Sequence, residues 1–380
     1  MRFLKLDTGV IDSFDAALGG EGLRIDTGPG AALRRLAGHR GWGVALAALA
    51  RALSAPGPEA RAAIAGNLAR KRIRVPAVFG NPLVSGLYGY VKRVEAALLR
   101  QTLLAELAAT DPEVVVVYNG SVYPESVLAE VSRGRPRVFI EAGFFPQTLQ
   151  IDPEGLNGAN SVPRDAAFYR DESRDFAAGG YPDAVNNRPS KARHDAVALE
   201  PGFIFVPFQV PSDMQVTLHS PWVRDMGAFL DVICDLADRL PGERFVIKEH
   251  PSFKLSVKGR RSHPRVTFAN GNVTSELIRD ARAVITLNST VGIEALLLER
   301  PVITLGAACY NIEGLVRHAP NAQALEAAVA ARDWQADPQL VRQFIGYLWN
   351  HYLVHGSYAD LPQDLPRILS VRAGQRQPIL

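Results

Sequence analysis

The chain has 380 residues, of which 47% are hydrophobic and 21% charged, and its formal net charge is +3. This length is too great for one ordinary core and suits two domains, and the composition excludes a disordered polymer, a coiled coil and a collagen-like fibre. The small net charge is also unlike that of nucleic-acid-binding proteins, which normally carry a strong, clustered basic excess. We therefore expect a two-domain globular protein with no nucleic-acid partner.

The cysteine content and the short apolar segments bear on where the protein is located. Cys234 and Cys309 are the two cysteines of the chain, too few for a disulfide framework or a metal knuckle. The first ten residues lack the apolar stretch of a signal peptide, and the longest apolar stretch, 43–50, is far shorter than the ~20 residues that span a bilayer. We expect a cytoplasmic protein, with contact at the cytoplasmic face of the inner membrane left open.

The first half of the chain contains a strand–helix–strand pattern. Apolar residues recur at helical spacing over 94–109, and Val114–Val117 is typical of a strand buried on both faces. A helix over 125–131 and a strand over 137–140 follow. Residues 152–195 are rich in Pro, Gly and Asn without periodicity, which is typical of a functional segment or a linker.

The second half repeats the alternation of strands and helices. We expect strands over 203–206, 244–247, 283–287 and 302–305, and helices over 224–240, 274–282, 291–298, 322–332 and 340–354. The whole pattern favours an α/β fold with two Rossmann-like domains facing a cleft. We place the first domain at 1–195, the second at 196–335, and terminal helices that pack across both at 336–380.

Polar residues follow two of the strands in the second half. The sequence Lys-Glu-His-Pro occupies 248–251, and Asn-Ser-Thr occupies 288–290 just before a helix that contains Glu294. Hydroxyls and backbone N–H groups at a helix N-terminus can bind an anion. Each motif alone is as typical of a helix cap or a strand end as of a ligand site. Because they follow strands of one domain, together they predict a nucleotide-phosphate site.

Two carboxylates occupy comparable strand-end positions. Glu141 ends an apolar strand, and Asp213 follows the first strand of the second half. An apolar environment raises the pKa of a carboxyl group towards the range useful in acid–base catalysis. Each alone is more typical of a cap or an ion pair. As a pair they fit glycosyl chemistry, one as a base and the other as a nucleophile or charge stabiliser.

Other motifs point away from common enzyme classes. His351 and His355 are four residues apart but lack the glutamate of a zinc protease, and no Asp-x-Asp follows a predicted strand, so we expect no metal. Phosphate-loop, Gly-x-Gly-x-x-Gly and Gly-x-Ser-x-Gly spacings are also absent from the sequence. The basic helix Arg61–Arg74 is either a solvated face or a patch that contacts a membrane surface.

Several segments together resemble the bacterial capsule polysaccharide synthesis family, whose characterised members are β-Kdo transferases that use CMP-Kdo. The matching segments are 118–120, 141–146, 152–157, 248–251, 288–295 and 301–310. The resemblance implies a B-type glycosyltransferase fold, with the acceptor in the N-terminal domain and the nucleotide sugar in the C-terminal domain. It also implies transfer with retention of the β configuration, without a metal or another cofactor.

The resemblance also assigns roles to individual residues. Glu141 would be the acid/base that acts on the acceptor hydroxyl, and Asp213 the carboxylate that attacks or shields the anomeric carbon. The implied donor-binding residues are Gln209, Lys248, His250, Pro251, Asn288, Ser289, Thr290 and Glu294. The implied acceptor-binding residues are Asn119, Gly143 and Asn157.

We therefore expect a glycosyltransferase of capsule or lipopolysaccharide synthesis. Its expected partners are a CMP-sugar donor and a glycan or glycolipid acceptor, with peripheral contact at the inner membrane left open. Three alternatives remain at this point: the same fold with another nucleotide sugar, a nucleotide-sugar 2-epimerase, and an inactive scaffold in capsule assembly.

Overall fold

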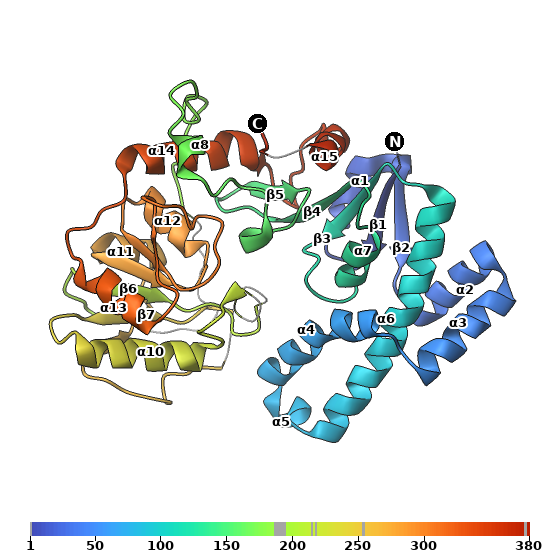
Figure 1. The fold of residues 1–380 in the computed structure, drawn as a ribbon, viewed down its shortest axis with the longest axis horizontal. Helices are drawn as coiled ribbons and strands as arrows, with labels where there is room; N and C mark the ends of the chain where they lie inside the picture. The colour runs from blue at the N-terminus through green and yellow to red at the C-terminus, as the bar shows by residue number, and fades with distance from the viewer. Residues whose placement is uncertain (1, 186–194, 214–215, 217–218, 253–254, 376–377) are drawn as a thin grey trace. The chain divides into compact units, whose positions relative to one another are not determined.

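The computed structural model describes residues 2–185, 195–213, 216, 219–252, 255–375 and 378–380 (Figure 1). The chain forms two compact units, each built on its own six-stranded sheet. Unit 1 takes the described residues of Met1–Ala142, Gln147–Leu156 and Val354–Ile379, and unit 2 takes those of Gly143–Pro146, Asn157–Leu353 and Leu380. Mixed α/β units with mostly parallel sheets confirm the predicted pair of Rossmann-like domains.

The division along the chain differs from the predicted boundary at residue 195. The described part of 157–195 belongs to unit 2 because its aromatic residues pack against α14 (Pro338–Tyr347). The ring of Tyr347 lies 5.7 Å from that of Tyr169 and 5.4 Å from that of Phe176. The terminal region is shared: α14 belongs to unit 2 and α15 (Leu365–Gly374) to unit 1.

The sheet of unit 1 has the strand order β12-β5-β4-β3-β1-β2. Strands β1 to β4 are parallel, whereas β5 is antiparallel to β4 and β12 is antiparallel to β5. The sequence predicted β3 and β4 only. The strands are β1 (Phe3–Asp7), β2 (Gly22–Asp26), β3 (Val114–Tyr118), β4 (Arg137–Ala142), β5 (Thr148–Asp152) and β12 (Val354–His355).

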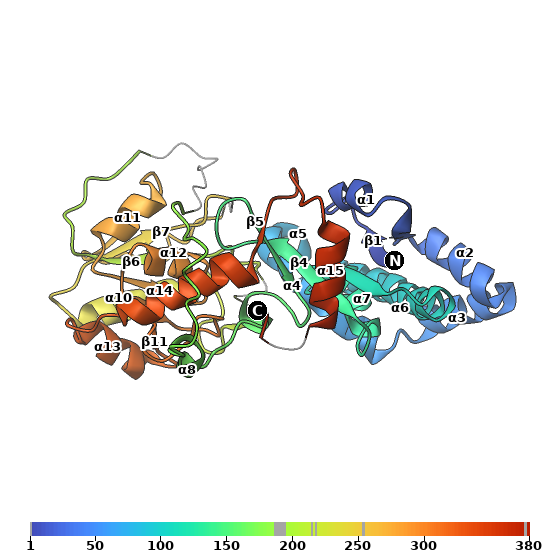
Figure 2. The ribbon, with the colours of Figure 1, turned by 90° about the horizontal axis from the view of Figure 1, so that it is seen from above.

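Helices cover both faces of this sheet (Figure 2). Val115 and Val117 pack with residues of α4, α6 and α7, whereas Val114 and Val116 pack with residues of α1 and α15. The burial of all four valines confirms a strand with two covered faces. The helices are α1 (Ser13–Leu18), α2 (Pro29–Arg40), α3 (Trp42–Ser54), α4 (Pro58–Arg74), α5 (Pro76–Phe79), α6 (Pro82–Thr110) and α7 (Glu125–Val131).

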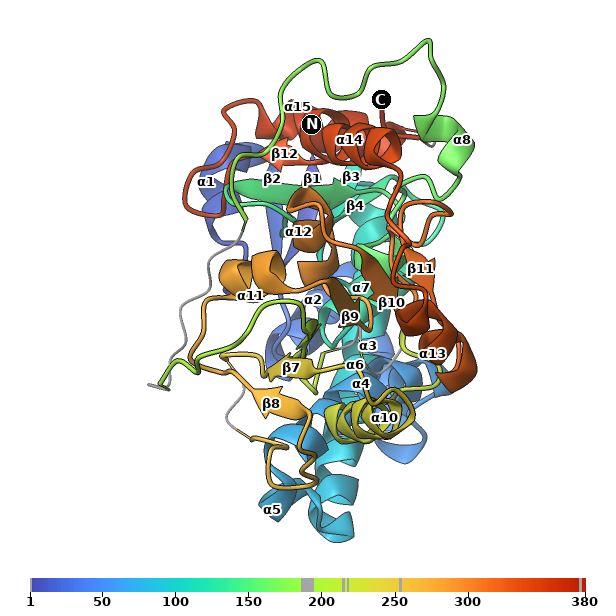
Figure 3. The same ribbon diagram turned by 90° about the vertical axis from the view of Figure 1, so that its left-hand side faces the viewer.

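The sheet of unit 2 has the strand order β11-β10-β9-β6-β7-β8, and every neighbouring pair is parallel (Figure 3). Four of these strands match predicted ones, whereas the short β8 and β11 were not predicted. The strands are β6 (Ile204–Pro207), β7 (Phe245–Lys248), β8 (Val266–Phe268), β9 (Ala283–Thr286), β10 (Val302–Thr304) and β11 (Arg317–His318).

Helices α10 to α14 of unit 2 agree in position with predicted ones, whereas α8 was not predicted. The helix predicted over 340–354 is too long, because Val354 lies in strand β12 and pairs there with Leu149. On one face of the sheet, Phe229 and Ile233 of α10 and Leu325 of α13 pack against Ile204 and Phe245 of the strands. The helices are α8 (Ala166–Tyr169), α10 (Met226–Arg239), α11 (Thr274–Asp280), α12 (Val291–Leu297), α13 (Ala322–Ala330) and α14. Among the residues described in both units, no helix is long and apolar enough to cross a bilayer.

Candidate functional site

The order of strands in unit 2 creates a topological switch point between β6 and β9. Strands β7 and β8 lie on one side of β6, whereas β9, β10 and β11 lie on the other. In an open parallel sheet, the loops that follow such central strands diverge and leave room for a ligand at their carboxyl ends. The residues after β6, β7 and β9 therefore share the edge at which a ligand is expected.

Gln209 and Asn288 join the two central strands at this edge. Gln209 follows β6 and Asn288 follows β9, and both side chains are buried. Gln209 Nε2 donates to Asn288 Oδ1 at 3.0 Å, and the main-chain N–H of Asn288 donates to Gln209 Oε1 at 3.4 Å. This pair fixes the spacing of the two loops at the switch point.

We expect Gln209→Leu to destabilise the protein by about 1–3 kcal/mol, because Asn288 loses a bonded partner at a buried position. Urea unfolding measures this loss. Gln339→Leu serves as the control, since its side chain is exposed and lies outside this edge. Equal unfolding midpoints for Gln209→Leu and the wild type would show that the amide pair contributes nothing.

A small pocket lies beside this pair. Lys248, His250, Pro251 and Glu294 line it, so the structure brings together four of the predicted donor-binding residues. Lys248 is 9% exposed, its Nζ donates to the carbonyl of Asn272, and burial lowers its pKa. The other lining residues are Phe205, Pro207, Phe208, Glu249, Thr274 and Val291. A cation at a largely apolar wall binds an anion more strongly than a solvated cation does.

Hydrogen bonds of the loop after β7 orient the His250 ring. The main-chain N–H of Ser252 donates to His250 Nδ1 at 3.3 Å, and Ser252 Oγ lies 2.8 Å from the same atom. An amide N–H requires a lone pair on Nδ1, so we assign the ring proton to Nε2. The adjacent Glu249 accepts from the main-chain N–H of Val257 and the side chain of Asn270, both at 2.8 Å. Glu249 therefore holds the loop, and His250 presents an Nε2–H donor.

The loop after β9 holds Ser289 and Thr290, which are partly buried. Ser289 Oγ accepts from the main-chain N–H of Val291 at 3.2 Å, and Tyr310 donates its hydroxyl to the Ser289 carbonyl at 2.5 Å. A Cβ at Gly292 would lie 2.4 Å from the Tyr310 hydroxyl. The small residue at 292 thus allows the tyrosine to fix the loop. Thr290 precedes α12 without a side-chain capping bond.

Asp213 lies near a histidine that the sequence analysis missed. Burial lowers the pKa of His219, and the negative charge of Asp213 opposes this shift. The His219 carbonyl accepts from Asn288 Nδ2 at 3.3 Å and from the Ala307 N–H at 2.8 Å. His219 and Asp213 therefore belong to the same edge as Asn288. No predicted strand ends at His219, so strand-end reasoning could not find it.

Two predicted acceptor-binding residues lie in unit 2. The segment Asn157–Ala159 is a 3₁₀ turn next to the loop after β10. A Cβ at Gly158 would lie 2.8 Å from the Ala307 carbonyl oxygen and 3.6 Å from the His219 ring. Gly143 precedes Phe144, whose ring stacks on Tyr352 at 6.0 Å within unit 2. Asn157 thus lies on the side of the predicted donor residues, whereas the prediction placed it in the first domain.

Glu141 belongs to unit 1, near the end of β4, paired in register with Gln150 of β5. Burial raises the pKa values of Tyr118 and Tyr358, and the nearby charge of Glu141 raises both further. The two rings lie 6.4 Å apart. Asn119, with φ of 58°, follows β3 and donates its main-chain N–H to the Ile140 carbonyl at 3.0 Å. The end of β3 and β4 therefore gathers Glu141, two phenol groups and Asn119.

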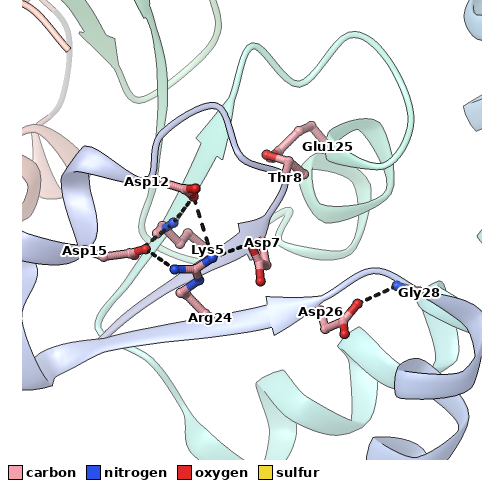
Figure 4. Close-up of polar contacts among 9 residues, drawn as sticks. All are labelled: Lys5, Asp7, Thr8, Asp12, Asp15, Arg24, Asp26, Gly28 and Glu125. Carbon is pink, nitrogen blue, oxygen red and sulfur yellow. Dashed lines mark hydrogen bonds and ion pairs between the residues drawn. The ribbon is translucent and has the colours of Figure 1, made fainter. Parts of the chain in front are cut away.

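Glu125 is a second carboxylate at this edge, and the sequence analysis did not single it out. Its Oε2 accepts from the Tyr118 N–H at 3.1 Å. Thr8, which lies next to Glu125 in Figure 4, donates its Oγ1–H to Glu125 Oε1 at 3.4 Å. Thr8 follows β1, and Tyr118 ends β3, so Glu125 lies at the switch point of the unit 1 sheet. Burial raises its pKa to about 8.

A separate ion-pair cluster lies around β1, apart from Thr8 and Glu125 (Figure 4). The buried Lys5 pairs with Asp15 at 2.9 Å, and Arg24 pairs with Asp7 at 2.5 Å and with Asp15 at 2.6 Å. Asp26 Oδ1 accepts from the Gly28 N–H at 2.8 Å at the start of α2. These ion pairs hold β1, β2 and α1 together. We assign them a structural role.

The raised pKa of Glu125 makes stability depend on pH in a defined window. Between pH ~4.5 and ~8, the folded carboxyl keeps a proton that the unfolded one loses, so stability falls as the pH rises. Glu125→Gln removes this dependence. We expect the wild type to lose about 2–4 kcal/mol relative to the variant from pH 5 to pH 8. Urea unfolding at several pH values, with Glu130→Gln as the control, measures the difference. Parallel curves would contradict the assignment.

Comparison with known proteins places the chain among capsule proteins. A profile of the family described as "Capsule polysaccharide biosynthesis protein" matches residues 184–358. The chain is 55% identical over 368 residues to Protein FixF of Sinorhizobium fredii strain NGR234, covering 96% of this chain and 91% of that protein. It is 31% identical over 161 residues to the capsule polysaccharide export protein KpsS of Escherichia coli, covering 40% of each. Among solved structures, KpsC β-Kdo 2,7 transferase of Thermosulfurimonas dismutans matches with a TM-score of 0.45 and 19% identity, over 73% of this chain and 90% of that one.

Proposed function

The chain belongs to the family of capsule polysaccharide biosynthesis proteins, and from this premise we propose that it is a glycosyltransferase of bacterial surface polysaccharide synthesis. One observation carries the proposal. At the switch point of unit 2, the Gln209–Asn288 pair lies beside a pocket lined by Lys248, His250 and Glu294. The carboxyl edge of a parallel sheet is where nucleotides bind in such folds, so this pocket is the donor site.

The proposed donor is CMP-Kdo. Its phosphodiester and the carboxylate on the anomeric carbon give it two anionic groups close together. Lys248 supplies a cation and His250 an Nε2–H donor at one pocket, and the loop of Asn288 and Ser289 supplies amide and hydroxyl groups. These groups offset the charge of the leaving CMP without a metal ion. Chelator treatment is accordingly expected to leave the activity unchanged.

The proposed reaction retains the β configuration. Asp213 attacks the anomeric carbon, or shields its positive charge, as the bond to the CMP oxygen breaks and its electron pair leaves with the phosphate. Glu141 takes the proton of the acceptor hydroxyl, whose oxygen then bonds to the anomeric carbon and displaces Asp213. Two successive displacements on one carbon give net retention. The acceptor is a glycan or a glycolipid.

The test supplies CMP-Kdo, generated in situ, together with a panel of glycan and glycolipid acceptors. We expect release of CMP and a Kdo-bearing product detected by mass spectrometry. Turnover of a UDP-sugar without turnover of CMP-Kdo would overturn the donor assignment. Conversion of a nucleotide sugar to its 2-epimer without transfer would instead identify an epimerase. A folded protein that turns over no nucleotide sugar would be a scaffold, and the proposed activity would be wrong.

A further inference from the structure

Large apolar side chains are exposed at one end of the helical layer of unit 1. The helical tip, defined here as residues 71–91, comprises the end of α4, α5 and the first turns of α6. Leu83 is 81% exposed, Leu87 67% and Val78 47%. Further exposed apolar residues of the tip are Val75, Val84, Tyr90 and Val91. A contiguous group of this kind is typical of a surface that meets a partner or a membrane.

The exposed residues of α6 lie on one stripe of the helix. Asn81 caps the helix, since its Oδ1 accepts from the main-chain N–H groups of Leu83 at 2.9 Å and Val84 at 3.4 Å. Leu83 and Leu87 are one turn apart, and Val91 follows after another turn, so all three face the same side. Such a stripe normally packs on a core. Here it faces outward.

Contacts between the three helices make the tip one continuous surface. Lys71 Nζ lies 5.6 Å from the centre of the Phe79 ring and 5.9 Å from that of Tyr88. Arg72 Nε donates to Ser85 Oγ at 3.5 Å, and the same hydroxyl donates to the Phe79 carbonyl. Figures 1 and 3 show α5 and the start of α6 side by side, away from the sheet of unit 1. The basic end of α4 thus lies at the same end of the helical layer as the start of α6, on the side of α6 that carries Ser85 and Tyr88.

The charge of this region differs from that of the whole chain. Of the 35 residues from 60 to 94, seven are Lys or Arg and none is Asp or Glu, whereas the whole chain carries a net charge of only +3. Three of the cations, Lys71, Arg72 and Arg74, belong to the tip itself and are exposed. The positive charge is therefore concentrated in the helices that form the tip.

We propose that the helical tip docks onto an anionic phospholipid surface. Leu83 and Leu87 enter the boundary between headgroups and acyl chains, and Lys71, Arg72 and Arg74 lie at the level of the lipid phosphates. Exposed leucines and exposed cations on one tip match the two layers of a bilayer surface, which is apolar inside and negatively charged at its rim. A second copy of the chain fits less well, because self-association would bring two sets of cations together. A nucleic acid would leave the aliphatic side chains in water.

The test uses the full chain and sedimentation with phosphatidylglycerol vesicles, with phosphatidylcholine vesicles alongside. We expect binding to the anionic vesicles that weakens as salt is raised. Leu83→Gln with Leu87→Gln should weaken it at least ~10-fold, since each leucine loses its apolar contact while glutamine keeps a good helix propensity. Lys71→Gln with Arg72→Gln should weaken it and reduce its salt dependence. Leu104→Gln, at an exposed position further along α6, is the matched control.

The outcomes separate docking on lipid from contact between copies of the chain. No binding of the wild type to anionic vesicles, or equal binding of Leu83→Gln/Leu87→Gln, would overturn the proposal. Self-association that these substitutions abolish, without vesicle binding, would identify the tip as an interface between copies. Circular dichroism checks that each variant is folded. CMP binding by the same variants, which involves unit 2, shows whether any loss is confined to the tip, so this test stands apart from that of the proposed activity.

Discussion

Replacing Glu141 with Gln is expected to reduce transfer to the acceptor by about 10²–10⁴-fold, the range over which a positioned general base contributes to catalysis. Glutamine keeps the size of the side chain at the end of β4 but cannot take a proton from the acceptor hydroxyl. The affinity for the donor should stay unchanged, because the proposed donor pocket lies in unit 2. Steady-state kinetics with CMP-Kdo and acceptor measure the loss, and CMP binding measures the affinity.

Glu125→Gln is the matched control for this prediction. Both carboxylates raise the pKa of Tyr118, so both lie close to one phenol group. The raised pKa of Glu125, about 8, keeps it largely protonated at neutral pH, and a neutral amide imitates that form. We therefore expect the activity of Glu125→Gln to stay within a few-fold of the wild type. A large loss of activity in Glu125→Gln with little loss in Glu141→Gln would show that Glu125, and not Glu141, is the general base.

The first strands of unit 1 show where the sequence pattern misleads. The strand β1 has the sequence FLKLD, in which a lysine interrupts an apolar run. Lys5 is nevertheless 1% exposed, because Asp15 of α1 pairs with it. Only the tertiary contact makes a charged residue compatible with a strand interior. By contrast, the four valines of β3 need no such partner, so their burial on both faces was predictable.

The described part of the irregular region 157–195 was not predicted to belong to the second domain, for a similar reason. Phe168, Tyr169 and Phe176 follow neither a helical nor a strand period, yet they pack with Tyr347 of α14. The Pro, Gly and Asn content suggested a functional segment or a linker, and an aromatic cluster joins the segment to unit 2. Tyr347, which holds it, is about 170–180 positions away in the chain, and no local pattern could identify this contact.

The candidate donor residues were predictable because one rule locates them. Lys248 ends strand β7, and His250 and Asn288 follow β7 and β9; parallel strands bring their carboxyl ends to one edge. His219 and Glu125 occupy no such position. Glu125 reaches its edge from a helix, through bonds to Thr8 and the Tyr118 amide. His219 is held at the edge of the unit 2 sheet by its carbonyl, which accepts hydrogen bonds from Asn288 and Ala307. Their neighbours come from packing, which sequence spacing does not encode.

Replacing Asp213 with Asn is expected to reduce CMP release by about 10²–10⁴-fold if the carboxylate forms the bond to the anomeric carbon, and by less if it only shields developing charge. CMP affinity should change little, since Lys248, His250 and Glu294 line the pocket. Asp333→Asn, an exposed aspartate elsewhere in unit 2, is the control. An Asp213→Asn variant that releases CMP at the wild-type rate would show that Asp213 has no role in the reaction.

The same Asp213→Asn substitution has a second readout that does not depend on activity. The charge of Asp213 raises the pKa of His219 against the effect of burial, so its removal should lower that pKa further. An NMR titration of the His219 ring measures the change. An unchanged His219 pKa would contradict the proximity of Asp213 to His219 in the structure. A lowered His219 pKa with unchanged catalysis would support the proximity of Asp213 to His219 but reject the role of Asp213 in the reaction. The two measurements therefore test the site and its function separately.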